Sequence, residues 1–272
     1  MTTTETFDEV QALRMGKKIF GVISPIMYVR CYAVDGLLID SGLSCFTNEV
    51  LSFATAANVN QVVITHHHED HSGNALALTK AGYPVLASSA TNHILSNGFG
   101  IHFYQQVVWA PAPVTSTSEL GSEVKTNRYN FQVINVPGHA TDQVALYEPE
   151  KQWLFSADAF LADKVKYFRK DEDFLQSLDS VQKLSKLKVK KIFCCHRPTF
   201  QDAETALKRK LDFMLNLKER TISLKKEGYS IDEITLQLLG KEDRLMYWFT
   251  AGDVSKRNVI RSILEGPVLR KN

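Results

Sequence analysis

The stretch THHHEDHSG (residues 65–73) brings four histidines and two carboxylates into nine residues. It follows Gln61-Val62-Val63-Ile64, an apolar run that is typical of a short buried strand. Alternate side chains of an extended chain point to the same side, so His66 and His68 can converge while His67 points elsewhere. Imidazole and carboxylate are the side chains that divalent Zn, Mn or Fe accept as ligands. The spacing therefore predicts a metal site rather than a solvated polar loop.

Two metal ions need more donors than one loop supplies. Asp70 and His71 complete an HxHxDH pattern where the chain should turn into a helix. Three further donors each stand just after a predicted strand: His139 in VPGHA, Asp158 in FSADAF and His196 in IFCCHRP. Sites in α/β proteins are usually built at strand ends, so we expect these side chains to meet.

The elements that must position these donors alternate along most of the chain. Strands are expected at 18–24, 27–34, 37–40, 61–64, 85–88, 131–136, 144–147, 153–156 and 191–195. Helices are expected at 47–57, 74–81, 91–95, 173–186, 202–227, 231–239 and 255–264. Strand signals disappear after residue 200. The pattern predicts an α/β catalytic domain over residues 1–200 and a helical C-terminal domain over 201–272.

The chain has 272 residues, of which 44% are hydrophobic, so it can bury a large core. The formal charge of +2 implies no strong field for nucleic acid or membranes. None of the four cysteines forms a CxxC pair, so we expect a reducing compartment, and we interpret Cys195 as a core residue. The N-terminus has no apolar signal segment, and no run approaches the roughly 20 apolar residues of a membrane span. These features predict a cytoplasmic protein without a membrane segment.

The order HxHxDH, His, Asp, His resembles the metallo-β-lactamase-fold hydrolase superfamily over about residues 18–200. Within it, THHHEDHSG is most similar to the glyoxalase II group, and the helical tail resembles the winged-helix-like domain of lactamase-β-like members. The resemblance implies an αββα sandwich, in which two mixed sheets lie between outer helices and the site lies at one edge. We therefore expect this fold, extended by C-terminal helices.

The resemblance also implies a role for each donor. One ion would take His66, His68 and His139; the other would take Asp70, His71 and His196; Asp158 would bridge them. Asp40, in LLIDSG, matches an aspartate that the family often keeps near the site. The expected cofactors are two divalent ions, zinc first, with manganese or iron as alternatives. A hydroxide shared by two cations is a nucleophile at neutral pH, and Asp70 could take or pass its proton.

The substrate is less well defined by the sequence. Glyoxalase II-like enzymes carry a tyrosine where this chain has Pro198, and lactonases of this fold usually carry one where it has Leu161. The leading hypothesis is a hydrolase for a small thioester, ester or lactone. One alternative is a phosphodiesterase or RNase, although the tail is only modestly basic for nucleic acid. The other is a mononuclear iron enzyme resembling persulfide dioxygenases. We expect a small-molecule partner, and the sequence leaves a homodimer open.

Overall fold

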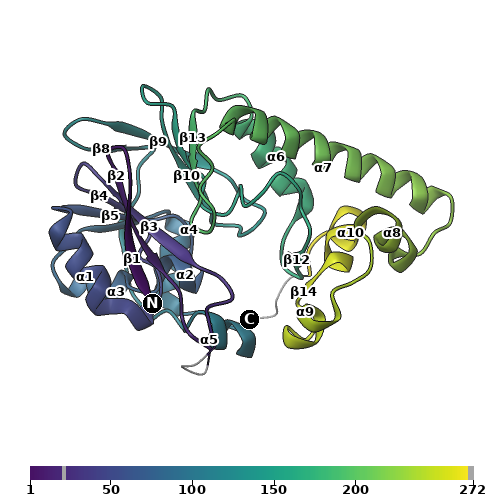
Figure 1. The fold of residues 1–272 in the computed structure, drawn as a ribbon, viewed down its shortest axis with the longest axis horizontal. Helices are drawn as coiled ribbons and strands as arrows, with labels where there is room; N and C mark the ends of the chain where they lie inside the picture. Colours follow the sequence, from purple (N-terminus) through teal and green to yellow (C-terminus); the bar gives the residue numbers. More distant parts are fainter. Residues whose placement is uncertain (20–22, 269–272) are drawn as a thin grey trace. The chain divides into compact units, whose positions relative to one another are not determined.

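The computed structural model describes residues 1–19 and 23–268, which form two compact units (Figure 1). Unit 1 comprises Met1–Asn135, Asp142–Ala157 and Phe193–Pro198. Unit 2 comprises Val136–Thr141, Asp158–Ile192 and the described residues from Thr199 onward. Unit 2 thus includes two segments that precede residue 200, and the domain boundary expected at that residue stays a prediction.

The first sheet of unit 1 has seven strands in the order β1-β2-β3-β4-β5-β6-β7. They are β1 (Thr2–Phe7), β2 (Val10–Met15), β3 (Val29–Val34), β4 (Leu37–Ile39), β5 (Gln61–Ile64), β6 (Val85–Ala87) and β7 (Ser118–Glu119). The first four strands pair antiparallel, and β4 to β7 pair parallel. Parallel pairing sets the carboxyl ends of β4 and β5 at the same edge of the sheet, which is where the histidine stretch begins.

Helices connect these strands and cover one face of the sheet. They are the short 3-10 helix η1 (Ser44–Phe46), α1 (Thr47–Ala56), α2 (Glu69–Ser72), α3 (Ala75–Lys80), α4 (Ser89–Asn97) and α5 (Phe103–Val108). Val50 of α1 and Leu78 of α3 share one buried cluster with Leu38 of β4 and Val62 of β5. This cluster fixes the two strands that lead to the histidine stretch, because neither strand can shift without exposing apolar surface.

The second sheet of unit 1 faces the other side of the first. Its order is β13-β11-β10-β9-β8, with β8 (Glu123–Lys125), β9 (Asn130–Asn135), β10 (Val144–Glu148), β11 (Trp153–Phe155) and β13 (Lys191–Phe193). Aromatic rings fill the space between the sheets: the Tyr32 centroid lies 5.7 Å from that of Phe155 and 5.5 Å from that of Phe193. Because Phe193 precedes Cys195 and His196 directly, this packing also anchors the segment that carries the last predicted ligand.

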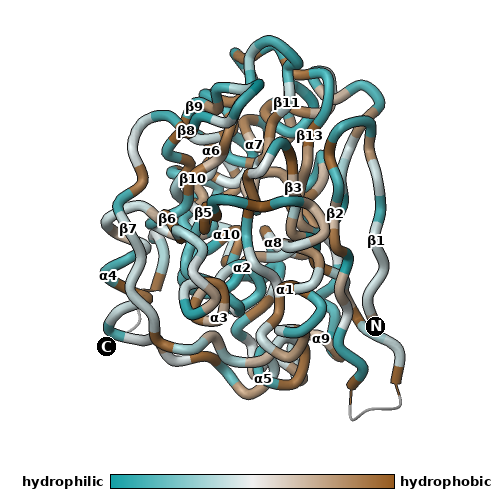
Figure 2. Tube along the Cα trace, turned by 90° about the vertical axis from the view of Figure 1, so that its left-hand side faces the viewer, coloured by the Kyte–Doolittle hydropathy of each residue, from teal (hydrophilic) through white to brown (hydrophobic). Residues whose placement is uncertain are grey.

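Unit 2 is mainly helical. Its helices are α6 (Phe174–Leu184), α7 (Ala203–Lys226), α8 (Ile231–Leu239), α9 (Arg244–Phe249) and α10 (Lys256–Glu265), and a two-stranded sheet pairs β12 (Phe168–Arg169) with β14 (Val254–Ser255). Its core gathers Phe174, Met214, Ile234 and Val259 from four of these helices. Colours in Figure 2 change between teal and brown within single elements of both units, because each element buries one face. No helix of the described chain is both long enough and apolar enough to cross a bilayer.

Most of the expected elements that lead to the site are confirmed, but the sequence reading missed others. The strands at 61–64, 144–147 and 153–156 and the helices at 47–57 and 231–239 match observed elements within one or two residues. The strand expected at 18–24 falls partly on residues 20–22, outside the described residues. The expectation of no strand after residue 200 was wrong for the two residues of β14.

The N-terminal strands and two short helices had no clear sequence signal. In β1 the sequence TTTETF is polar and only partly buried, since this strand lies at a sheet edge and is held by backbone hydrogen bonds to β2. Helices α5 and α9 span six residues each, which is too short to establish a helical repeat.

Candidate metal centre

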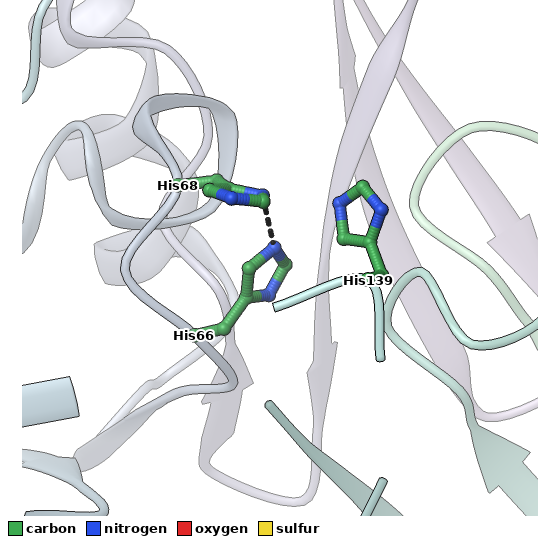
Figure 3. A group of neighbouring side chains, drawn as sticks. All are labelled: His66, His68 and His139. Carbon is green, nitrogen blue, oxygen red and sulfur yellow. Dashed lines mark hydrogen bonds between the residues drawn. The ribbon is translucent and has the colours of Figure 1, made fainter. Parts of the chain in front are cut away.

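The predicted convergence of His66 and His68 is confirmed. Both are buried in the turn between β5 and α2, and His66 Nε2 lies 2.9 Å from His68 Nδ1. Figure 3 shows these two rings and the hydrogen bond between them. His67 points away: its backbone nitrogen and Nδ1 each lie 2.8 Å from a carboxylate oxygen of Asp142. His66 and His68 thus lie together as expected, although the chain bends at residues 66 and 67 rather than staying extended, and His67 binds Asp142 instead.

The Asp40 carboxylate orients the His71 ring through a contact to its Nδ1 atom. Asp40 follows β4 with a φ of +62°, a backbone conformation that aspartate tolerates better than most residues. Its Oδ2 lies 2.7 Å from His71 Nδ1, and its Oδ1 accepts hydrogen bonds from the backbone nitrogen and hydroxyl of Thr65 at 2.8 and 2.9 Å. With Nδ1 held by this carboxylate, Nε2 is the His71 nitrogen that faces Asp70 Oδ2, at 3.9 Å, and Cys195 Sγ, at 3.4 Å.

His196 is oriented in the same manner. Its Nδ1 lies 2.9 Å from the backbone oxygen of Tyr28, and the Trp109 ring stacks against its imidazole with centroids 5.7 Å apart. Its Nε2 lies 3.5 Å from Asp70 Oδ2. The ligand atoms of Asp70, Cys195 and His196 all lie within 4.8 Å of one another. Unit 1 thus brings together His66, His68, Asp70, His71 and His196, which are five of the seven predicted ligands.

Unit 2 carries the other two predicted ligands. His139, the third side chain drawn in Figure 3, has Nε2 at 3.2 Å from Asp158 Oδ2. Its Nδ1 lies 3.1 Å from Glu172 Oε2, and Glu172 Oε1 accepts a hydrogen bond from the backbone nitrogen of Arg169. Burial alone would lower the pKa of His139, but the carboxylates of Glu172 and Asp158 outweigh it and raise that pKa above its usual value.

The turn before His139 requires glycine. Gly138 has a φ of +133°, and a Cβ atom there would lie 2.2 Å from Ser177 Oγ and 2.4 Å from Ser177 N. The backbone of this turn therefore packs directly on the first turn of α6, and it fixes where the His139 side chain starts.

Two acidic residues of the site had no local sequence signal. Asp142 binds His67 across 75 residues of chain, and Glu172 binds His139 across 33. Asp142 stands three positions after His139, but nothing in TDQV indicates a partner for the earlier loop. Glu172 lies in the run KDED, which reads as an ordinary charged turn. Both contacts depend on the fold.

A hollow of about 240 Å³ lies beside His196 in unit 1. Its lining residues are Arg14, Ile26, Met27, Tyr28, Arg30 and His196. Arg30 is neutralised by Glu5 and donates to the backbone oxygen of His196, whereas the Arg14 guanidinium lies 3.7 Å above the Tyr28 ring. Arg14 Nε is buried without a hydrogen-bond partner among the described residues. The hollow therefore offers a positive charge beside apolar side chains.

Comparisons with known proteins give a family and a set of relatives. The model of the metallo-beta-lactamase superfamily matches residues 25–196, a range that contains all seven predicted ligands. A hydroxyacylglutathione hydrolase of Legionella pneumophila is 28% identical over 147 residues, which cover 53% of this chain and 51% of the relative. A beta-lactamase-like protein 2 homolog of Caenorhabditis elegans is 23% identical over 205 residues, covering 72% of this chain and 63% of the relative. The chain spans about half the length of the first curated relatives it matches.

Solved structures confirm the predicted fold class. A metallo-beta-lactamase from Pontibacter korlensis superposes with a TM-score of 0.61 at 19% identity, covering 79% of this chain and all of that one. A flavo di-iron protein from Thermotoga maritima superposes with a TM-score of 0.58 at 18% identity, covering 85% of this chain and 72% of that one. At such identities the likeness shows the fold alone: an α/β sandwich of mixed sheets, extended here by the helices α7 to α10.

Proposed function

We propose a function for this protein from one premise, which is that the chain belongs to the metallo-β-lactamase superfamily. On that premise it is a metal-dependent hydrolase that cleaves a small thioester, ester or lactone. The observation that carries the proposal is the cluster of imidazole and carboxylate donors after β5 and β13, in which His71 and His196 are each oriented through Nδ1. Relatives named hydroxyacylglutathione hydrolase favour a thioester within this class.

The donor set fits two divalent ions. Nitrogen and carboxylate oxygen ligands in buried, pre-oriented positions suit Zn, and also Mn or Fe. We assign His66, His68 and His139 to one ion and Asp70, His71 and His196 to the other, with Asp158 between them. A carboxylate or backbone oxygen contacts Nδ1 of His71, His139 and His196 and orients each ring. Metal-binding imidazoles commonly have such partners.

The bound ions supply the chemistry: they lower the pKa of water to about 7 and polarise the carbonyl under attack. The residues of the chain do the positioning. Asp70 presents Oδ2 towards His71 Nε2 at 3.9 Å and His196 Nε2 at 3.5 Å, and this carboxylate can hold a proton that leaves the attacking water. Burial of Asp70, His66 and His68 excludes bulk water around them, which strengthens every electrostatic contact in the cluster.

The hollow beside His196 narrows the substrate class. Its Arg14 charge, next to the apolar side chains of Ile26 and Met27, suits a substrate whose leaving or acyl part carries a carboxylate near an apolar segment. Residues Pro198 and Leu161 stand where related thioesterases and lactonases carry tyrosines, so recognition here depends on other residues. We therefore expect an anionic acyl thioester or lactone rather than glutathione thioesters specifically.

The first test is metal content followed by a substrate panel. The full chain, purified without added metal, is measured by elemental mass spectrometry and then assayed on thioesters, lactones and phosphodiesters. About two zinc or manganese ions per chain together with thioester or lactone turnover supports the proposal. About one iron per chain without hydrolysis overturns it in favour of an oxygen-dependent enzyme. Turnover of phosphodiesters or RNA alone overturns the carbonyl-substrate assignment.

Variants of the cluster complete the test. We expect Asp70→Ala and His71→Ala to abolish turnover and to reduce metal content while the fold persists, because both side chains are ligands in the proposed set. His93→Ala, which changes an exposed histidine of α4, is the matched control and is expected to keep metal and turnover. Full activity in Asp70→Ala would contradict the assignment.

A further inference from the structure

Helix α9 carries a run of consecutive apolar residues, LMYWF (residues 245–249), and none of them is fully buried. Leu245 and Trp248 stand three positions apart, so they share one face of the helix, and they are 82% and 78% exposed. A helix in a folded domain ordinarily turns such side chains towards the core. Apolar side chains that gather on an exposed surface mark a place where another molecule binds.

A groove of about 570 Å³ lies beside this run, and all its lining residues belong to unit 2. We call it the α8–α9 groove; helices α8, α9 and α10, which lie together in the C-terminal part of Figure 1, all contribute to it. Its apolar lining consists of Leu236, Tyr247 and Trp248, and each of these side chains is exposed. None of the groove residues belongs to the candidate metal centre, so the groove is a second site.

The charged residues of the α8–α9 groove leave two cations unpaired. Asp232 accepts a hydrogen bond from Arg257 Nε at 2.7 Å. The Glu242 carboxylate accepts from backbone nitrogens at the start of α10, at 3.1–3.2 Å. The side chains of Lys241 and Arg244 have neither an ion pair nor a hydrogen bond with any residue that the structure describes. The groove therefore presents two positive charges beside exposed apolar side chains.

The aromatic side of the groove is held in place before a partner binds. A Cβ atom at Gly252, where φ is +73°, would lie 3.0 Å from the Tyr247 ring, so the ring packs directly on this turn. The Trp248 ring meets that of Tyr247 edge-on, with centroids 6.2 Å apart. Asp243 Oδ1 accepts from the backbone nitrogen of Met246 at 3.0 Å and caps α9. A surface fixed in this way loses little conformational entropy on binding.

We propose that the α8–α9 groove binds a segment of a partner protein in which acidic side chains stand beside apolar ones. Tryptophan, tyrosine and arginine dominate the binding energy of protein interfaces, and the groove offers all three. Carboxylates of the segment would pair with Lys241 and Arg244, while its apolar side chains would cover Leu236 and Trp248. Two unpaired cations are few for a nucleic-acid backbone, which requires a denser positive surface. This binding activity goes beyond the proposed hydrolysis and does not depend on it.

Selection from a random dodecapeptide library on the full chain tests the proposal. We expect the recovered peptides to carry Asp or Glu next to Leu, Phe or Trp. A fluorescein-labelled peptide of the recovered consensus should bind Trp248→Ala about 30-fold or more weakly than wild type, and Arg244→Glu about tenfold or more weakly. Phe103→Ala and Lys80→Glu change an exposed aromatic residue and an exposed cation of unit 1, and these matched controls should bind as wild type does.

The remaining outcomes overturn the proposal or separate it from the proposed function. Recovery of no peptides, or of peptides without acidic residues, excludes this partner chemistry, and equal binding by wild type and both groove variants places the peptide elsewhere. If Trp248→Ala abolishes binding of labelled oligouridylate instead, the groove belongs to single-stranded RNA. If it converts a wild-type dimer into a monomer in light scattering, the groove belongs to a second copy. Asp70→Ala, which should lack turnover, should bind the peptide as tightly as wild type.

Discussion

Removing one acceptor from Asp40 should weaken metal binding without unfolding the protein. The Asp40 carboxylate accepts on both oxygens: Oδ1 from the Thr65 backbone nitrogen and Oδ2 from His71 Nδ1. Asparagine has the same size, but its amide has one acceptor and one donor. Whichever way the amide of Asp40→Asn turns, one N–H group of Thr65 or His71 faces another N–H group.

The size of the effect follows from two independent magnitudes. Loss of a hydrogen bond to a charged group costs about 1.5–3 kcal/mol. Loss of the carboxylate behind a metal-binding histidine typically weakens metal affinity by about 10–100-fold, which corresponds to roughly 1.4–2.7 kcal/mol. Because the two ranges overlap, we expect Asp40→Asn to bind zinc about 10–100-fold more weakly at the ion held by His71.

The assay is competition for zinc between the protein and a chromophoric chelator, with wild type and variant compared at one pH. Asp35→Asn is the matched control, since Asp35 also has a positive φ, of +48°, and accepts from the backbone nitrogen of Arg128 near the surface. Asparagine tolerates that backbone conformation and keeps one acceptor there. A folded Asp40→Asn protein that holds zinc as tightly as wild type would refute the argument that Asp40 orients His71.

Three further predictions concern the hollow, the core of unit 2 and acid stability. Arg14→Gln should raise KM about tenfold or more for carboxylate-bearing substrates and leave KM for neutral analogues unchanged, as steady-state kinetics can check. Phe174→Ala removes a fully buried ring and should cost about 3–5 kcal/mol in denaturant unfolding, whereas exposed Leu175→Ala should change stability by less than about 0.5 kcal/mol. The pKa of Glu9 is lowered to about 2 from 4.5, first by its hydrogen bond to Lys151 and then by that to Tyr129. Its stabilisation is therefore present above pH 4.5 and lost as pH falls towards about 2, so the melting temperatures of Glu9→Gln and wild type should differ at pH 7 and converge in acid.

The first half of the site could be predicted because its information is local. Val62 to Ile64 form a buried strand, and His66 and His68 follow it within four residues, in the turn where their side chains meet. Asp40 was named only through the resemblance to the metallo-β-lactamase-fold superfamily, which often keeps an aspartate at this place. The structure supplies the physical reason: β4 lies parallel to β5, with Leu38 opposite Val62, so the end of β4 lies beside the start of the histidine stretch.

The partners of the ligands could not be predicted because their information is distributed. Glu172 reaches His139 only after α6 and the turn at Gly138 are in place, and Asp142 reaches His67 only once β10 is paired in its sheet.

The proposed donors divide unevenly between the two units, and that division has a consequence for metal binding. Asp70, His71 and His196 belong to unit 1, whereas His139 and Asp158 belong to unit 2. In the proposed assignment His139 is a ligand of one ion only, and Asp158 is shared by both. Replacing His139 by alanine should therefore lower zinc content from about two ions per chain to about one, as elemental mass spectrometry can measure. Loss of both ions in His139→Ala would show instead that the two sites fill only together.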